Sequence, residues 1–353
     1  MCIAKAAELL LKGELVAFPT ETVYGLGADA ENPEAVAKIY QAKGRPQNHP
    51  VIVHLPPDAD ISYWVSHVPE EAKLLIQHFW PGPLTLILPR AKHIPDAVSG
   101  GQPSIGLRCP SHPVAQQLLR AFAQLRPNAG VAAPSANKFG QVSPTSAAHV
   151  ESEFPGEIQH HQLYVVEGGD ADIGIESTIV DLSRIAEGIG AVLLRPGHIT
   201  RQQLADVLGY MPASPDKAAP RVSGTLKAHY APHTPLQMVQ KEDYKGLLTH
   251  IPKNEKWVLM GFPQDLLKLQ ELAISHLSVV SHQNTLSLSD KQSTIDLYPV
   301  SDDPTVYAKS IYALLRQLDT QGYQRICVQA LPQDLDWEAL NDRLQRAAAA
   351  FES

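Results

Sequence analysis

The sequence predicts a mixed α/β protein of two domains, and three observations support this. The chain has 353 residues, of which 44% are hydrophobic, and this is enough to bury two ordinary hydrophobic cores. Short apolar runs alternate with segments of helical spacing on both sides of residues 211–235. That stretch is dense in Pro, Ala and Ser and keeps neither period, so we interpret it as a linker.

The first part of the chain predicts a partly antiparallel sheet. Its strands are not uniformly separated by helices, particularly from residue 163 onward, as they would be in a doubly wound fold. The expected helices cover residues 3–12, 33–42, 69–79 and 112–125. The expected strands cover residues 14–18, 51–55, 84–89, 104–108, 130–133, 163–166, 178–182 and 191–195.

Beyond the linker, strand and helix alternate again. WVLMGF predicts a strand and PQDLLKLQELAISH a helix, and a polar strand or loop region follows to about residue 300. A helix, the strand RICVQAL and a final helix complete the chain. This alternation predicts a small parallel sheet flanked by helices.

Charge and composition narrow the class of protein. The formal net charge of −8 argues against a protein that coats nucleic acid through bulk electrostatics. Near the N-terminus, Glu8, Lys12 and Glu14 interrupt the apolar spacing too early for a signal peptide or a membrane span. The three cysteines are far apart and have no CxxC spacing, so we expect reduced thiols. We therefore expect a cytoplasmic protein with no membrane partner.

Residues 19–30, PTETVYGLGADA, contain a glycine pattern that raises the question of a dinucleotide-binding turn. That fingerprint requires the glycines to open a helix directly and an acidic residue about 20 positions further on. The next helical pattern begins only at Asn32–Pro33, and residues 41–57 contain no carboxylate. We therefore interpret the glycines as a turn. The Thr20–Glu21–Thr22 triplet then presents polar side chains to a small ligand, or forms a polar turn that satisfies its own backbone.

Three motifs place a cation at a strand or loop end, with a proline one or two positions beyond. The repeated arrangement predicts convergence on one anion. A triphosphate suits it, because arginine forks and a lysine point charge match phosphate oxygens. The alternative is that each arginine makes its own surface salt bridge. The motifs are KGRP with Lys43 and Arg45, GLRCP with Arg108, and LRPG with Arg195.

Short polar side chains also follow or enter predicted strands. PSAN and QVSPT come just after the apolar run at 131–133, and IESTIVD leads into another strand. Hydroxyl and amide groups there can contact phosphate, ribose or a carboxylate, or they can form simple turns. The candidates are Ser135, Asn137, Ser143 and Ser177.

Familiar catalytic motifs are missing from the sequence. It contains no GxxxxGK[ST] phosphate loop, no HExxH helix and no GxSxG elbow. His229 and His233 are four apart, but Pro232 between them disfavours a regular helix and no third ligand is indicated. We expect no protein-held metal, and chemistry that depends on holding reactants and stabilising charge on phosphate.

Seven motifs together resemble a known family. PTETVYGLG, KGRP followed by VIVHL, WPGPLTLIL, IGLRCPSHP, APSAN, IESTIVD and LRPG occur in that order over about residues 10–200. They are similar to the YrdC-like domain of the threonylcarbamoyl-AMP synthase family, and SGTLKAHYAPHTP resembles the linker of its two-domain form. The resemblance implies a YrdC-like mixed twisted sheet with flanking helices over residues 1–205. It also implies a linker at 206–235 that closes over the active site, and a smaller Rossmann-like α/β domain at 236–353.

The resemblance further implies a reaction. L-threonine, bicarbonate and ATP would give threonylcarbamoyl-AMP and pyrophosphate, with Mg²⁺ accompanying ATP. The enzyme would be a nucleotidyltransferase, and a separate transferase complex would use its product to modify an adenosine beside the tRNA anticodon. Direct tRNA binding by this chain is left open.

The resemblance also assigns roles to residues. Lys43 and Arg45 would act in catalysis. L-threonine would be bound by Thr22, His54, Arg108 and Ser177. ATP would be bound by Lys43, Arg45, His49, Ser104, Ser135, Asn137, Ser143 and Arg195, and by Tyr230 from the linker.

The sequence departs from the family pattern in places. His49 stands where Asn is usual, Ser104 where Thr is common, and the linker reads SGTLKAHYAP instead of SPGMxYxHYAP. An RNA-binding YrdC-like module is the main alternative, but the acidic total and the lack of a basic stretch interleaved with aromatics count against it. Carbamoyl transfer of the hydrogenase-maturation type would bring zinc fingers, and no paired cysteines are present.

Overall fold

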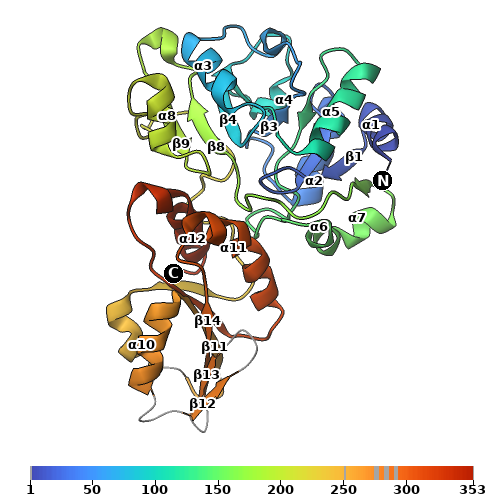
Figure 1. Ribbon diagram of the computed structural model, residues 1–353. Helices are drawn as coiled ribbons and strands as arrows, with labels where there is room; N and C mark the ends of the chain where they lie inside the picture. The colour runs from blue at the N-terminus through green and yellow to red at the C-terminus, as the bar shows by residue number, and fades with distance from the viewer. Residues whose placement is uncertain (1, 250–251, 274–277, 282–285, 290–292, 353) are drawn as a thin grey trace. The chain divides into compact units, whose positions relative to one another are not determined.

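The computed structural model describes residues 2–249, 252–273, 278–281, 286–289 and 293–352, and its chain forms two compact units (Figure 1). The first unit comprises Met1–Phe139 and Ser143–Leu226, and the second comprises Gly140–Val142 and Lys227–Ser353. The Pro-rich stretch is thus shared, since its first part belongs to the first unit and the rest to the second.

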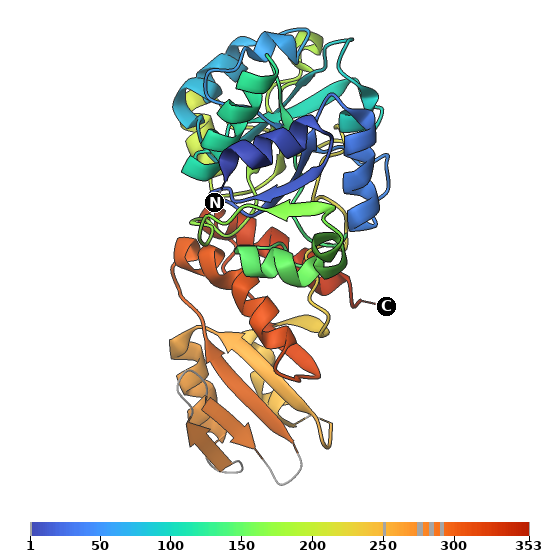
Figure 2. The same cartoon turned by 90° about the vertical axis from the view of Figure 1, so that its right-hand side faces the viewer.

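A nine-stranded mixed sheet forms the first unit (Figure 2). Its strands are β1 (Leu15–Phe18), β2 (Gly25–Asp29), β3 (Ile52–His54), β4 (Leu84–Pro89), β5 (Ser104–Arg108), β6 (Val131–Ala132), β7 (Leu163–Val165), β8 (Thr178–Asp181) and β9 (Val192–Arg195). They lie in the order β7-β1-β2-β6-β3-β5-β4-β8-β9. The pairs β1–β7, β3–β5 and β4–β8 are parallel and the other neighbours are antiparallel. The expected partly antiparallel sheet is confirmed.

Helices cover this sheet and bury its apolar side chains. They are α1 (Ile3–Leu11), α2 (Pro33–Lys43), α3 (Glu70–Phe79), α4 (Asp96–Ser99), α5 (Pro113–Leu125), α6 (Ala147–Glu153), α7 (Pro155–Gln159) and α8 (Arg201–Leu208). One core cluster joins α1 and α5 to the sheet through Leu10, Phe122 and Phe18, all fully buried. A larger cluster, which includes Leu26, Ile39 and Leu86, contains the side chains of α2 and α3.

The ends of α2 follow from its sequence. The Asn32 side chain accepts hydrogen bonds from the N–H groups of Glu34 and Ala35, at 3.0 and 3.2 Å. Pro33 occupies the first helical position, where its missing N–H costs nothing. Gly44 ends the helix in the left-handed conformation, with φ +63°. Lys43 is therefore the last helical residue, and Arg45 begins the loop that follows.

The interpretation of Gly25 and Gly27 as a turn is wrong. Both residues lie in β2, which pairs antiparallel with β1 and β6. A Cβ at Gly27 would lie 2.8 Å from Phe18 Cε1, 2.8 Å from Val131 Cγ1 and 2.9 Å from the Val16 carbonyl oxygen. The glycine is needed for close packing inside a strand, a use that glycine has in sheets but that a turn-based interpretation overlooks.

A six-stranded sheet forms the second unit. Its strands are β10 (Leu236–Val239), β11 (Lys256–Gly261), β12 (Ser278–Ser281), β13 (Leu286–Ser289), β14 (Thr294–Pro299) and β15 (Arg325–Gln329), in the order β10-β15-β11-β14-β13-β12. The first four strands in this order are parallel, which confirms the expected parallel sheet, and β13 and β12 extend it antiparallel. Its helices are α9 (Tyr244–Thr249), α10 (Pro263–Ala273), α11 (Pro304–Asp319) and α12 (Glu338–Ala349).

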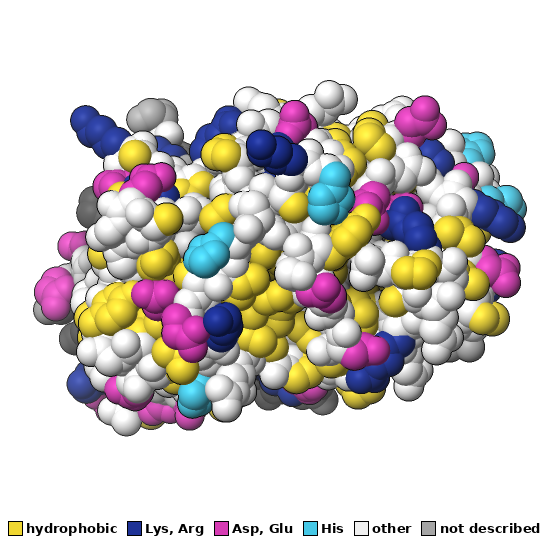
Figure 3. Space-filling model, turned by 90° about the horizontal axis from the view of Figure 1, so that it is seen from above, with side chains coloured by type: hydrophobic (Ala, Val, Ile, Leu, Met, Phe, Trp, Pro, Cys, Tyr) yellow, Lys and Arg dark blue, Asp and Glu magenta, His cyan; other side chains and the backbone are white. Residues whose placement is uncertain are grey.

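Surface charge, helix length and the state of the cysteines can be compared with what the composition predicts. On the face shown in Figure 3, basic and acidic side chains are interspersed around apolar ones. Within the part of the chain that the structure describes, no helix is long and apolar enough to cross a bilayer. Cys109 and Cys327 are buried free thiols, and Cys2 is an exposed one.

Gly27→Ala should destabilise the protein by about 1–3 kcal/mol, because the new methyl group would overpack a strand interior. The midpoint of urea unfolding, followed by fluorescence, measures this. Gly156→Ala is the matched control, because a Cβ there meets nothing within 4 Å and alanine is favoured in helices. Equal midpoints for the two variants would contradict the packing role of Gly27.

Candidate functional site

Five polar side chains form a row across one face of the nine-stranded sheet. His54 on β3 lies opposite Arg108 on β5, and Arg108 lies opposite Thr85 on β4. Thr85 Oγ1 is 2.8 Å from Ser177 Oγ. Arg195 at the end of β9 donates from Nη2 to Ser177 Oγ at 3.1 Å and to the Ser177 carbonyl at 2.9 Å. The structure thus brings together three of the predicted threonine contacts with one predicted ATP contact.

An apolar row runs beside the polar one. Ile52, Gly106 and Ile87 lie opposite each other, two residues before His54, two before Arg108 and two after Thr85. Residues two apart on a strand share a face, so both rows belong to the same face. A Cβ at Gly106 would lie 3.1 Å from Ile87 Cδ1 and 3.5 Å from Ile52 Cγ1. The glycine therefore keeps the middle of this face open.

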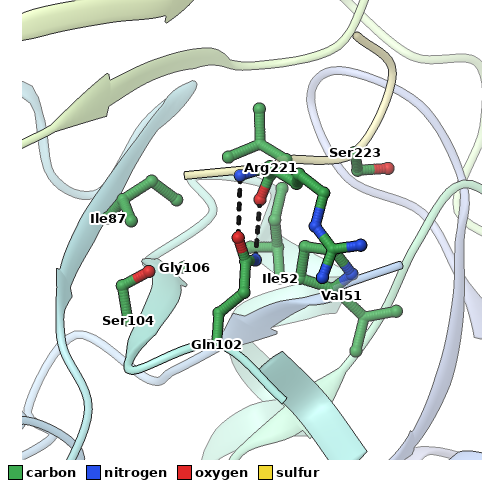
Figure 4. Close-up of a pocket in the computed structure, with 10 residues that line it drawn as sticks. Val51, Ile52, Ile87, Gln102, Ser104, Gly106, Arg221 and Ser223 are labelled. Carbon is green, nitrogen blue, oxygen red and sulfur yellow. Dashed lines mark hydrogen bonds between the residues drawn. The ribbon is translucent and has the colours of Figure 1, made fainter. Parts of the chain in front are cut away.

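A small pocket lies over the apolar row (Figure 4). Ser104 lines it together with the three residues of that row, and Arg221, Val222 and Ser223 of the Pro-rich stretch lie across it. Gln102 holds this stretch through two hydrogen bonds with Arg221, accepting from its N–H at 2.8 Å and donating to its carbonyl at 2.9 Å. The first part of the predicted linker thus packs on the site face.

Two predicted cations converge on Ser223. Arg195 Nη1 donates to the Ser223 carbonyl at 2.8 Å, and Arg45 Nη1 lies 3.4 Å from Ser223 Oγ. Arg45 also donates to the Pro50 carbonyl at 2.8 Å. Arg45 and Arg195 are 6% and 3% exposed, so surface salt bridges do not account for them.

Lys43 is held by the loop that follows β6. Its Nζ donates to the carbonyls of Ser135 and Asn137 at 2.6 and 2.5 Å. Burial, and secondarily the positive charge of Arg45, hold the pKa of Lys43 well below its usual value. Gly25 forms a bridge with Ser135, which joins this loop to the chain just after the Thr20–Thr22 triplet.

The triplet between β1 and β2 serves two purposes. Thr20 Oγ1 donates to the Val23 carbonyl at 2.6 Å and lies 2.9 Å from Thr22 Oγ1, so this part is a turn that satisfies its own backbone. Glu21 instead forms a buried ion pair, in which Arg108 Nη2 donates to Oε1 at 2.6 Å. The polar-turn alternative is thus confirmed at Thr20, and contact of the triplet with a small ligand stays a prediction.

Burial favours the neutral form of the His54 imidazole. Burial, and then the positive charge of Arg108, lower the pKa of His54 to about 3. Its Nδ1 and the Nε of Arg108 are buried and have no hydrogen-bond partner. Such groups are costly unless a partner is supplied, so each of these two atoms is a candidate contact for a polar ligand.

The other predicted contacts are distributed between the two units. Ser143 Oγ donates to Glu176 Oε1 at 2.5 Å, and the His49 ring lies 5.5 Å from the Phe139 ring, which the Arg45 guanidinium also faces. Tyr230 belongs to the second unit. Its ring stacks on Tyr312 at 5.8 Å, and its φ is +62°. That Tyr230 covers the nucleotide stays a prediction.

Several residues at the site were missed in the sequence. Thr85 interrupts the apolar strand LTLIL, and such a polar side chain in a buried strand is a usable signal. Glu176 precedes the Ser177 that was selected, but nothing in its spacing points to Ser143. Ser223 gives no local signal, because its contacts with Arg45 and Arg195 depend on the path of the Pro-rich stretch.

Comparisons with known proteins place both parts of the chain. The Sua5/YciO/YrdC family, described as "Telomere recombination", matches residues 8–197, and "Threonylcarbamoyl-AMP synthase, C-terminal domain" matches residues 199–349. Relatives named threonylcarbamoyl-AMP synthase include one from Pyrococcus abyssi, 32% identical over 97% of this chain and 93% of its own. Another is from Bacillus subtilis, 35% identical over 98% of this chain and 92% of its own.

A solved structure is similar over the same span. P. abyssi Sua5 complexed with L-threonine superposes with a TM-score of 0.75 at 30% identity, over 99% of this chain and 94% of that one. The likeness covers both units and not the first alone. This chain therefore belongs to the Sua5/YciO/YrdC family, in the two-domain form that carries a threonylcarbamoyl-AMP synthase C-terminal domain.

Proposed function

We propose that this protein is an L-threonylcarbamoyladenylate synthase, a nucleotidyltransferase that makes threonylcarbamoyl-AMP and pyrophosphate from L-threonine, bicarbonate and ATP. The observation that carries the proposal is the shared face of the sheet, where the row from His54 to Ser177 meets the buried cation Arg195. Relatives that match almost the whole chain bear the synthase name. They do not favour an RNA-binding module.

Threonine would bind at the polar row. The carboxylate of an amino acid suits the buried guanidinium of Arg108, which can offer its Nε. The hydroxyls of Thr22 and Ser177 and the neutral ring of His54 can pair with the polar groups of threonine. A site with such partners rejects valine, because valine would leave them unpaired. The L-threonine complex of P. abyssi Sua5 supports this choice of amino acid.

ATP would occupy the neighbouring part of the face. The apolar row of Ile52, Gly106 and Ile87 offers a flat surface for a base, beside the Ser104 hydroxyl. Phosphate oxygens would take the place of the carbonyls that Lys43, Arg45 and Arg195 now contact. The remaining polar contacts of the nucleotide would come from His49, Ser135, Asn137 and Ser143, with Tyr230 from the second unit.

Magnesium would arrive with ATP. Among the residues that the structure describes, no three His, Cys, Asp or Glu side chains gather in the manner of a protein metal site. Mg²⁺ is bound mainly by substrate phosphates and water with one or two carboxylates, so ATP would supply most of its ligands. Glu176, a buried carboxylate that accepts a hydrogen bond from Ser143, is the carboxylate we expect to take part. Bound Mg²⁺ would neutralise charge on the phosphates.

The reaction would proceed in two bond-forming steps. Bicarbonate takes up a proton and loses water to give carbon dioxide. The neutral threonine amine attacks this carbon dioxide, and loss of the N–H proton leaves a carbamate, so the net products are carbamate and water. A carbamate oxygen then attacks the α-phosphorus, and the bond from that phosphorus to the leaving pyrophosphate breaks. Negative charge grows on the phosphate oxygens, where Lys43, Arg45 and Arg195 stabilise it. Positioning and electrostatics therefore supply the catalysis.

The product has a defined onward use under this proposal. Threonylcarbamoyl-AMP is an activated carbamate whose adenylate leaves readily, so it suits a separate transferase complex that modifies tRNA. We place both reactions in the cytoplasm.

Purified protein should release pyrophosphate only when threonine, bicarbonate, ATP and Mg²⁺ are all present. Mass spectrometry should find threonylcarbamoyl-AMP in the same mixture, and valine should not replace threonine. Pyrophosphate release that ignores threonine or bicarbonate would contradict the proposed function.

Arg195→Ala should weaken ATP binding by about 1.5–3 kcal/mol, because a charge-assisted phosphate contact is lost. Titration calorimetry with ATP and Mg²⁺ measures the change. Arg126→Ala serves as the control, because Arg126 pairs with Asp29 at the end of β2, outside the site. An unchanged ATP affinity in folded Arg195→Ala would remove Arg195 from the phosphate site.

His54 should make the protein less stable in acid. In the unfolded chain a histidine binds a proton below pH about 6.5, whereas folded His54 stays neutral down to a pKa of about 3. The free energy of unfolding should therefore fall as pH decreases from 6.5, by up to about 1.4 kcal/mol per pH unit from this residue. Urea unfolding between pH 6.5 and 4.5 should show a shallower pH dependence for His54→Gln. An equal pH dependence of the unfolding free energy in the two proteins would contradict the lowered pKa of His54.

A further inference from the structure

Glu21 lies inside the amino-acid site, although the family resemblance gives it no role. Its side chain is 6% exposed and that of Arg108 is 5% exposed. Arg108 Nη2 donates to Glu21 Oε1 at 2.6 Å, and the Ser111 N–H donates to Oε2 at 3.1 Å. Both oxygens of the carboxylate therefore have a donor from the protein.

The main chain fixes Glu21 as well. The Ile173 N–H donates to the Glu21 carbonyl at 2.8 Å, and the neighbouring Thr20 forms the turn to Val23. The carboxylate is thus held at its backbone and at both of its oxygens. A carboxylate held in this way can orient the arginine that it binds, but it has little freedom to move together with a substrate.

The consequence for Arg108 is geometric. An arginine side chain has about 2 kcal/mol of rotamer entropy to lose, and the bond to Glu21 removes much of that freedom before a ligand arrives. One end of the guanidinium is occupied, whereas its Nε is buried without a hydrogen-bond partner, as is the Nδ1 of His54 opposite it on the neighbouring strand. Glu21 thereby leaves a defined edge of the guanidinium for the ligand.

The second consequence concerns charge. A buried arginine without a counter-ion is strongly unfavourable and attracts any small anion. With Glu21 paired to it, Arg108 presents a hydrogen-bonding edge but little net charge. An amino acid at neutral pH is a zwitterion with no net charge, so it suits a balanced pair better than phosphate or pyrophosphate does.

We infer that Glu21 is a positioning residue of the threonine site, which orients Arg108 and balances its charge so that the guanidinium accepts the carboxylate of a zwitterionic amino acid. The inference rests on the proposed function, because it takes Arg108 as a threonine contact. It predicts that substitution of Glu21 impairs the use of threonine and spares the use of ATP.

The test uses Glu21→Gln in the full-length chain, with pyrophosphate release measured against threonine and ATP in turn. The amide keeps the shape and an acceptor oxygen, but it removes the charge that holds and balances Arg108. The KM for threonine should rise at least about tenfold, equivalent to about 1.4 kcal/mol, and the KM for ATP should change less than about twofold. In an Arg108→Ala background, Glu21→Gln should have little further effect on threonine.

Asp181→Asn is the matched control. Asp181 is 1% exposed and, like Glu21, accepts hydrogen bonds from an arginine and a backbone N–H, those of Arg184 at 3.1 Å and Ser183 at 2.8 Å. It lies at the far end of β8 from Ser177. Both KM values of this variant should stay within about twofold of those of the unmodified protein.

Each remaining outcome decides the question. An unchanged threonine KM in Glu21→Gln, or equal rises for threonine and ATP, would overturn the inference and leave the proposed function intact. If the unmodified protein shows no threonine-dependent release, both fail. Glu21→Asp, which keeps the charge one methylene further away, covers the case in which the amide variant does not fold. It should raise the threonine KM, and an unchanged value would also overturn the inference.

Discussion

The site depends on the register of three adjacent strands. Pairing of β3, β5 and β4 places His54, Arg108 and Thr85 in one row and Ile52, Gly106 and Ile87 in the next. Side chains alternate between the faces of a strand, so a shift of one residue in any of these pairs would turn its polar group away from the site. Ser177 joins this alignment through its hydrogen bond with Thr85, and Arg195 joins it through its hydrogen bonds with Ser177.

The buried charges of the site need hydrogen-bond or ion-pair partners, because burying a charge is costly. Lys43, Arg45, Arg108 and Arg195 are all less than 9% exposed, and an unpaired buried cation is very unfavourable. Lys43 donates two hydrogen bonds to carbonyls, which are neutral acceptors, and its burial lowers its pKa. Arg108 instead has the carboxylate of Glu21. Arg108 is thus paired with a carboxylate, whereas the contacts described above for Lys43, Arg45 and Arg195 are with neutral carbonyl and hydroxyl oxygens.

Two glycines prevent side chains from crowding the sheet. Gly106 leaves the middle of the apolar row open, and Gly27 lets β2 pack closely against Phe18 and Val131. The Pro-rich stretch then covers part of the opening, where Ser223 contacts two of the cations and Gln102 holds Arg221. Under the proposed function, ATP would compete with this stretch for Arg195, because the Ser223 carbonyl now accepts a hydrogen bond from its Nη1.

Local patterns in the sequence determined most of the elements, because a strand end or a helix cap depends on a few neighbouring residues. The twelve expected elements between residues 3 and 195 correspond to observed ones within about two residues at each end. The seven motifs, taken in order, also identified the family, because together they contain side chains that the proposed reaction needs. The glycines of β2 were misjudged, because their closest contacts, Phe18 and Val131, come from other strands.

Only the tertiary structure decided the partners of the buried side chains. The Glu21–Arg108 pair spans 87 residues, and the contact of Arg45 with Ser223 spans 178. Such contacts depend on strand order and on the path of the Pro-rich stretch, and neither leaves a periodic signal in the chain. The sequence by itself therefore determined most of the elements, the family and the residue types of the site. Only the fold decided which carboxylate pairs with which cation, because pairing depends on distances in space that the sequence does not specify.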